Sequence, residues 1–317
     1  MRHRLYGQSI IWSQDFSPEL LKEIFERARH YKQHPRNKVL MGKRVIMLFH
    51  EASTRTRFSF EASVDDMGGT CISTENAERH SSFAKGESLE HSIRVLSSYG
   101  DAIVLRHSND DAAMIARDML QSENIWVPII NAGCGGIRGQ HPSQSGLDWF
   151  TIEDELGRTD NLNILVAGDL KHGRTVRSLI YLAGKYPGNS VCGVSSPHLA
   201  LGRDMIAYTY RHDVKYIQSA DLREYISWAD VVYMTRVQKE RFEDPEEYER
   251  VRHACRLTLE LAQKMKPGAI IMHPLPIDAD NGEIETAIER LPQAAFFRQS
   301  DNGVPIRKAL LEMVLGE

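Results

Sequence analysis

Two arginines and several hydroxyl side chains are clustered in the stretch EASTRTRFSF. Ser53, Thr54 and Thr56 could donate hydroxyl hydrogen bonds. The planar guanidinium of Arg55 matches the geometry of phosphate oxygens. The stretch follows RVIMLFH, an apolar run that is typical of a buried strand. Because Ser and Thr also cap helices, this turn alone fits either an anion site or a capped helix with two surface arginines.

Cations also follow three other apolar runs. Arg106 follows DAIVL, Arg174 lies beyond NILVAGD, and Arg236 follows DVVYMT. His273 and a rigid Pro-Leu-Pro segment follow AIIM. One cation after a strand is common, but cations after four separate strands predict a pocket for a strongly anionic ligand.

The elements that must position these residues are read from the spacing of apolar residues. Short runs rich in Val, Ile and Leu predict strands at 44–49, 101–106, 127–133, 163–169, 190–196, 230–236 and 269–275. Helical spacing is predicted at 59–69, which ends in two glycines, and at 88–100 and 175–186. This alternation indicates βαβ crossovers, so the predicted fold class is α/β, with two domains that are each a parallel β-sheet flanked by helices.

The length of 317 residues fits two domains of ordinary size. A long helical pattern after Pro142 suits a connector between the two series of strands. We therefore expect one domain at residues 1–141, completed by a C-terminal helix at 300–317, and the other at residues 142–299.

Composition and charge exclude several classes of protein. The chain has 42% hydrophobic and 26% charged residues, as a globular protein does, and its net charge of -4 provides no positive field for nucleic acid or an anionic membrane. No signal peptide and no membrane-spanning run is evident, so a cytoplasmic protein is expected. The four cysteines lack metal-ligand spacing, and VAGDLKHGR lacks the dinucleotide fingerprint, so we expect no metal and no cofactor.

Taken together, the motifs resemble those of the aspartate/ornithine carbamoyltransferase family. FHEASTRTRFSFE, KGESL, VLRH, QHPSQSGLD, GDLKHGRTVRSL, MTRVQKER and HPLP occur in the family's order over nearly the whole chain. S-T-R-T-R and H-P-x-Q are typical of carbamoyl-phosphate binding, and R-V-Q is typical of the members that use aspartate. The resemblance implies that residues 1–141 with 300–317 bind carbamoyl phosphate and that residues 142–299 bind aspartate.

The resemblance also implies a reaction. The amine of L-aspartate attacks the carbonyl carbon of carbamoyl phosphate, and the tetrahedral oxyanion expels phosphate, leaving N-carbamoyl-L-aspartate for pyrimidine biosynthesis. No enzyme nucleophile is needed, and one donor placed against the oxyanion can be worth about 3–4 kcal/mol.

Site residues are carried over from the matching motifs. The residues implied for carbamoyl phosphate are Ser53, Thr54, Arg55, Thr56, Ser81, Lys85, Arg106, His141, Gln144, Leu275 and Pro276. Those implied for aspartate are Lys85, Arg174, Arg236, Gln238 and Leu275. The implied catalytic residues are Arg55, Thr56, Lys85, Arg106 and His141. Arg57 is expected to be structural, because side chains two apart on a helix do not share a face.

In the family, the loop that carries Ser81 and Lys85 reaches the site of the neighbouring subunit. The resemblance therefore implies a homotrimer with shared active sites, and it leaves open whether regulatory subunits bind to that trimer.

Five positions depart from the family's usual residues: His50, Ala52, Cys134, His172 and Ile277. The loop NAGCGGIRG is also about two residues longer than usual, which would place Arg138 near the pocket entrance. These departures leave open a carbamoyltransferase for a different amino acid or amine. A second alternative is a non-catalytic paralogue that binds carbamoyl phosphate or a protein partner, which the loss of Arg55, Thr56, Arg106 or His141 would favour, but all four are present.

Overall fold

The computed structural model describes residues 2–77, 86–237, 244, 246, 248–249, 252, 255–278 and 282–316. Its contacts divide the chain into unit 1, formed by Met1–Leu147 with Asp301–Glu317, and unit 2, formed by Asp148–Ser300. Helix α6 (Pro142–Leu156) runs from one unit into the other. The boundary that we expected before residue 142 lies at the start of this helix, and the observed division lies within it.

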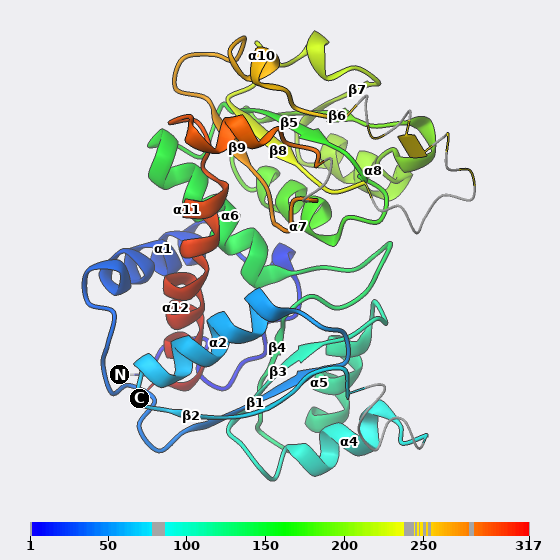
Figure 1. Cartoon of the computed structure of the whole chain (residues 1–317). Coiled ribbons are helices and arrows are strands. Elements are labelled where there is room, and N and C mark those ends of the chain that lie inside the picture. The colour runs from blue at the N-terminus through cyan, green and yellow to red at the C-terminus, as the bar shows by residue number, and fades with distance from the viewer. Residues whose placement is uncertain are drawn as a thin grey trace. The chain divides into compact units, whose positions relative to one another are not determined.

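Unit 1 is built on a parallel sheet. Its strands are β1 (Arg44–Phe49), β2 (Thr70–Thr74), β3 (Ala102–Arg106) and β4 (Ile129–Asn131), in the order β2-β1-β3-β4. Its helices are α1 (Pro18–Gln33), α2 (Thr54–Asp66), α4 (Leu89–Leu96), α5 (Ala112–Ser122) and α12 (Gly303–Leu315). Helix α12 returns from the C-terminal part of the chain and packs against α1 and α2 (Figure 1), so the two ends of the sequence complete one unit.

Unit 2 repeats this architecture with a larger parallel sheet. Its strands are β5 (Asn163–Ala167), β6 (Ser190–Val194), β7 (Lys215–Ser219), β8 (Val231–Met234) and β9 (Ile270–Met272), in the order β7-β6-β5-β8-β9. The other α-helices formed by described residues are α7 (Arg174–Ala183), α8 (Arg203–Arg211), α10 (Leu259–Ala262) and α11 (Phe296–Asp301). The predicted α/β class, with two parallel sheets flanked by helices, is confirmed.

Local signals account for several helix boundaries. The Ser17 hydroxyl accepts a hydrogen bond from the Leu20 N–H at 3.2 Å, and Pro18 occupies the first position of α1, where its missing N–H costs nothing. Helix α2 ends just before Gly68, whose φ of 78° is a conformation that glycine adopts without strain.

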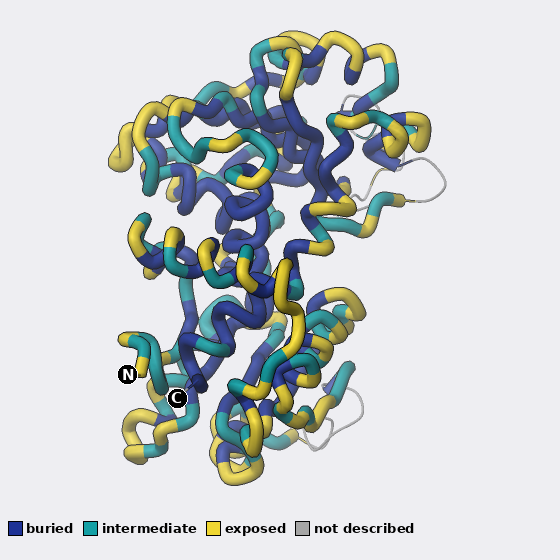
Figure 2. Tube along the Cα trace, turned by 90° about the vertical axis from the view of Figure 1, so that its left-hand side faces the viewer, coloured by how far each residue is buried: buried dark blue, intermediate teal, exposed yellow. Residues whose placement is uncertain are grey.

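All seven predicted strands are present, but two strands were missed. Strands β2 and β7 lie at the edges of their sheets. Their side chains are mostly exposed or half-buried, whereas β3 and β8 are almost wholly buried. Figure 2 shows the same contrast between buried interior segments and exposed outer ones in each unit. An edge strand needs no continuous apolar run, and such runs were the signal used for prediction.

Candidate active site

The sheet of unit 1 has a topological switch point between β1 and β3, because β2 continues from β1 on one side and β4 from β3 on the other. Open α/β sheets bind ligands beyond the carboxyl ends of the strands at such a point. Ser53 precedes α2 just after β1, and Arg106 is the last residue of β3. The topology therefore brings the STRTR turn and Arg106 to one edge of the sheet.

The first turn of α2 has the features of an anion site. It carries no acidic residue, and Ser53 at the N-cap makes no side-chain capping bond to the helix. The N–H groups that open a helix lack intrahelical partners and carry a partial positive charge. Arg55 is exposed and has no carboxylate partner among the described residues. Partial burial lowers the pKa of Arg55 from its ordinary value, but a guanidinium stays protonated at neutral pH.

Arg57 is held differently from Arg55. Its guanidinium lies 3.7 Å from the carboxylate oxygens of both Glu61 and Glu75. Glu75 also accepts a hydrogen bond from the Ser53 N–H at 2.8 Å. Arg57 thus belongs to a network that fixes the start of α2, which fits the structural role predicted for it.

Three predicted residues meet behind this turn. The hydroxyl Oγ1 of Thr56 lies 3.5 Å from Nε2 of His141, and both residues are buried. A Cβ atom added to Gly133 would lie 2.8 Å from Nη1 of Arg106 and 2.9 Å from Cδ2 of His141. Arg106 and His141 therefore line the same glycine, and a hydroxyl, an imidazole and a guanidinium are gathered at the switch point.

The loop before His141 is positioned by a residue that the sequence analysis missed. Oδ1 of Asn131 accepts hydrogen bonds from the N–H groups of Gly133 and Cys134 at 2.9 and 2.8 Å. Its Nδ2 donates to the Ile11 carbonyl at 2.8 Å. The available signal was an asparagine directly after an apolar strand, a residue type that often organises turns through its side chain. Gln144, which was predicted, lies two residues into α6 and is also buried.

Unit 2 presents its predicted residues at an equivalent edge. The switch point of its sheet lies between β5 and β8. The Thr235 N–H donates to the Ala167 carbonyl at 2.8 Å, and the Thr235 hydroxyl donates to the same oxygen at 3.0 Å. These bonds join the carboxyl ends of the two strands. Arg236 follows Thr235 directly, and Arg174 is the first residue of α7 beyond β5.

The segment after β9 borders the same edge of unit 2. The ring of His273 is buried, with Nε2 2.7 Å from Oε1 of Glu283, and Nδ1 accepts the Leu275 N–H at 2.8 Å. Leu275 has a φ of 55°, and its peptide bond to Pro276 is cis. His273 thus holds the backbone of the predicted substrate-contacting pair Leu275 and Pro276.

Three of the predicted site residues, Ser81, Lys85 and Gln238, lie outside the described residues, so their predictions stay predictions. The other predicted site residues separate by unit. Ser53, Thr54, Arg55, Thr56, Arg106, His141 and Gln144 belong to unit 1, and Arg174, Arg236, Leu275 and Pro276 belong to unit 2.

Three residues that depart from the family pattern are well integrated. Cys134 is buried, and its Sγ lies 3.5 Å from the Leu105 carbonyl oxygen. The ring Nδ1 of His172 lies 3.1 Å from the carboxylate of Asp169. Ile277 packs on the core of unit 2.

His50 is also integrated, because it is buried at the end of β1, with its ring centroid 4.2 Å from that of His107. Burial, and secondarily the His107 charge, lowers the pKa of His50 to about 4.

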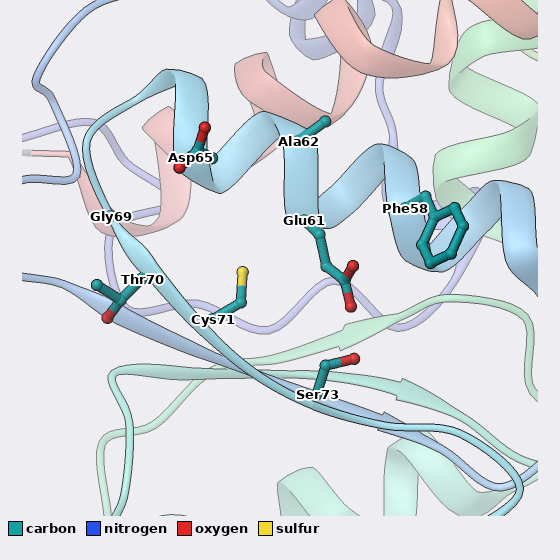
Figure 3. A pocket seen from close by; sticks show the side chains of 8 residues that line it. All are labelled: Phe58, Glu61, Ala62, Asp65, Gly69, Thr70, Cys71 and Ser73. Atoms are coloured by element: carbon teal, nitrogen blue, oxygen red, sulfur yellow. The ribbon is translucent and has the colours of Figure 1, made fainter.

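A pocket between α2 and β2 does not suit a strongly anionic ligand. Figure 3 shows the Glu61 and Asp65 carboxylates among its lining residues, which include no cation. Within the described residues, no group of His, Cys, Asp and Glu side chains has the arrangement of a metal site. None of the helices among those residues is long and apolar enough to cross a membrane.

Comparison with known proteins agrees with the motifs. Residues 8–154 match the model of the aspartate/ornithine carbamoyltransferase carbamoyl-P binding domain, and residues 160–314 match that of the Asp/Orn binding domain. The aspartate carbamoyltransferase catalytic subunit of Methanothrix thermoacetophila is 42% identical over 98% of this chain and 99% of its own length. Aspartate carbamoyltransferase 1, chloroplastic, of Pisum sativum is 44% identical over 96% of this chain and 78% of its own length.

Solved structures give the same result. The catalytic subunit of the Methanocaldococcus jannaschii aspartate transcarbamoylase is 40% identical, with a TM-score of 0.85 over 96% of this chain and 97% of that one. The Trypanosoma cruzi aspartate transcarbamoylase in complex with carbamoyl phosphate is 33% identical, with a TM-score of 0.90 over 98% of this chain and 97% of that one. The chain therefore belongs to the aspartate/ornithine carbamoyltransferase family of enzymes.

Proposed function

We propose that the chain transfers the carbamoyl group of carbamoyl phosphate to L-aspartate, giving N-carbamoyl-L-aspartate and phosphate for pyrimidine biosynthesis. The observation that carries the proposal is the cluster of Thr56, Arg106 and His141 beside the free start of α2. A paralogue that binds only a protein partner would have no need to retain these groups together. The relatives named above are aspartate carbamoyltransferases, which favours aspartate over other acceptors.

In unit 1, the helix start, Ser53, Thr54 and Arg55 would bind the phosphate group. Thr56, Arg106 and His141 would face the carbonyl oxygen, where they stabilise the charge that develops as the amine attacks. Gln144 would bind the carbamoyl NH2.

In unit 2, Arg174 and Arg236 would bind the two carboxylates of aspartate, with Gln238. Two fixed carboxylates orient the amine toward the carbonyl carbon, and such orientation is worth roughly 7–11 kcal/mol in favourable cases. The reaction needs no covalent bond to the enzyme, because the amine attacks carbamoyl phosphate directly and phosphate is the leaving group.

A direct assay tests the function. Purified protein is mixed with labelled carbamoyl phosphate and a panel of amines, including L-aspartate and L-ornithine, and the products are separated. We expect labelled N-carbamoyl-aspartate from wild type and none from Arg55→Ala, which should keep its melting temperature because Arg55 has no carboxylate partner in the described part of the chain. A labelled product with another amine only would reassign the acceptor. Phosphate binding without any product would support the non-catalytic alternative.

We propose further that the enzyme acts in the cytoplasm as a homotrimer, in which Ser81 and Lys85 of one chain complete the site of its neighbour. This rests on the family resemblance. Lys85→Ala and Arg106→Ala trimers are each expected to be inactive. Dissociating the two variants, mixing them and reassembling trimers should restore part of the activity. In a mixed trimer, one shared site receives Lys85 from the Arg106→Ala chain and Arg106 from the Lys85→Ala chain, and so has both cations. Verified mixed trimers without activity would contradict shared sites.

A further inference from the structure

We propose that Asp110 is a positioning residue for carbamoyl transfer. Its carboxylate anchors the loop 132–140, which joins β4 to His141, and so holds His141 and Arg106 in place. This inference rests on the function proposed above, although Asp110 itself lies in the turn between β3 and α5 and has no assigned contact with substrate.

The carboxylate of Asp110 binds the middle of this loop. Its Oδ1 accepts a hydrogen bond from the Gly136 N–H at 2.7 Å, and its Oδ2 accepts one from the Arg138 N–H at 3.4 Å. The guanidinium of Arg138 lies 3.7 Å from the same Oδ2. Hydrogen bonds to an ionised acceptor are stronger than neutral ones, so one side chain secures two backbone groups and a cation.

The loop is shaped to receive this carboxylate. Gly135 has a φ of 87°, and a Cβ atom there would lie 2.2 Å from Oδ1 of Asp110. The Gly135 N–H donates to the His107 carbonyl at 2.8 Å, which fixes the loop to the same turn a second time. Only glycine fits a left-handed conformation in such close contact. The loop backbone at Gly135 therefore fits closely against the Asp110 carboxylate and the turn that carries it.

The anchored loop touches the catalytic side chains at both ends. At its start, the Arg106 guanidinium donates to the Ala132 carbonyl at 3.4 Å, and Gly133 packs against Arg106 and His141. At its end, the Gln140 N–H donates to the Cys134 carbonyl at 3.0 Å, and the next residue is His141. A shift of the loop would therefore move both donors that face the carbonyl oxygen.

Four variants test the proposal. Asp110→Ala removes the anchor, whereas Asp110→Asn keeps an oxygen that can accept the Gly136 N–H. Asp111→Ala is the matched control. The half-exposed carboxylate of Asp111 lies 3.4 Å from the Arg138 guanidinium, and it caps no backbone N–H of α5. Gly135→Ala disturbs the same contact from the loop side.

We expect Asp110→Ala and Gly135→Ala to lower kcat by at least about ten-fold, since misplacing catalytic groups by about 1 Å can cost a hundred-fold. The KM for aspartate should change less than about three-fold, because the loop belongs to unit 1. Asp110→Asn should recover part of kcat, and Asp111→Ala should stay within about two-fold of wild type. Wild-type kcat in Asp110→Ala, or equal losses in Asp110→Ala and Asp111→Ala, would overturn the proposal.

Hydrogen exchange separates this inference from the proposed function. Deuterium uptake is followed in peptides that cover residues 132–140, with peptides from α12 as the internal reference. Asp110→Ala should speed exchange in the loop and leave α12 unchanged, and Gly135→Ala, which disturbs the same contact from the loop side, supplies the same reading if Asp110→Ala does not fold. An inactive wild type would refute the proposed reaction, while unchanged loop exchange in Asp110→Ala and Gly135→Ala would refute the anchor.

Discussion

Replacing His50 with Phe should reduce the protein's loss of stability in mild acid by about 2 kcal/mol. His50 is buried at the end of β1 against His107, and burial lowers its pKa to about 4 from an ordinary value of 6.5. The folded protein therefore keeps this imidazole neutral at pH values where the unfolded chain protonates it. Phe keeps an aromatic ring at this position but carries no titratable group.

The sign and size of the effect follow from the two pKa values. Because the folded pKa is the lower one, this contribution to stability is complete above pH 6.5 and decreases as the pH falls toward 4. At pH 5 the unfolded chain binds almost one proton more than the folded chain does at this site. The corresponding loss is about 2 kcal/mol, since each pKa unit is worth about 1.4 kcal/mol.

Urea unfolding at pH 5.0, 7.5 and 8.5 measures the effect, with protein concentration held constant. Between pH 7.5 and 5.0, wild type should lose about 2 kcal/mol more than His50→Phe does. Between pH 8.5 and 7.5 the two proteins should change equally, which controls for the cost of fitting Phe into the site. Equal losses for both proteins between pH 7.5 and 5.0 would show that His50 is not held neutral by burial.

Three further outcomes are expected. Arg236→Ala should raise the KM for aspartate by more than about ten-fold and leave carbamoyl-phosphate binding unchanged by calorimetry, because one substrate loses a carboxylate contact; an equal loss for both ligands would make Arg236 structural. Gly133→Ala should lower kcat about ten-fold or more, since its Cβ would press on Arg106 and His141, whereas Gly136→Ala, where a Cβ meets nothing within 4 Å, should not. Tyr233→Phe should cost about 1–3 kcal/mol in urea unfolding, because the buried Asp148 carboxylate loses a 2.9 Å hydrogen bond; unchanged stability would mean that this bond contributes nothing net.

The fold was predictable where burial is complete and less so where it is partial. Apolar runs located the central strands because both faces of a parallel sheet are covered by helices. The segments TCIST and KYIQS have no such run, since each forms a sheet edge with exposed side chains. Their strand character depends on pairing with β1 and β6, which no local pattern encodes.

The candidate site was predictable where chemistry demands a residue type at a strand end. Arg55, Thr56 and Arg106 could be proposed because cations and hydroxyls follow strands that the topology later brings together. Asn131 and Asp110 could not be singled out in this way. Each acts by accepting backbone N–H groups of the loop 132–140. This loop is irregular, so the sequence does not show which of its N–H groups lie near a given acceptor.

The same reasoning explains why the departures from the family pattern need not weaken the site. Cys134 departs from the family's usual residue, yet it is buried and its backbone N–H is held by Asn131. A carboxylate that accepts a backbone N–H of this loop is supplied by Asp110, on the facing turn. Asn131 and Asp110 thus satisfy backbone groups of the loop that holds Arg106 and His141 in place. What the chemistry constrains is the position of these two donors, and more than one arrangement of the supporting residues can provide it.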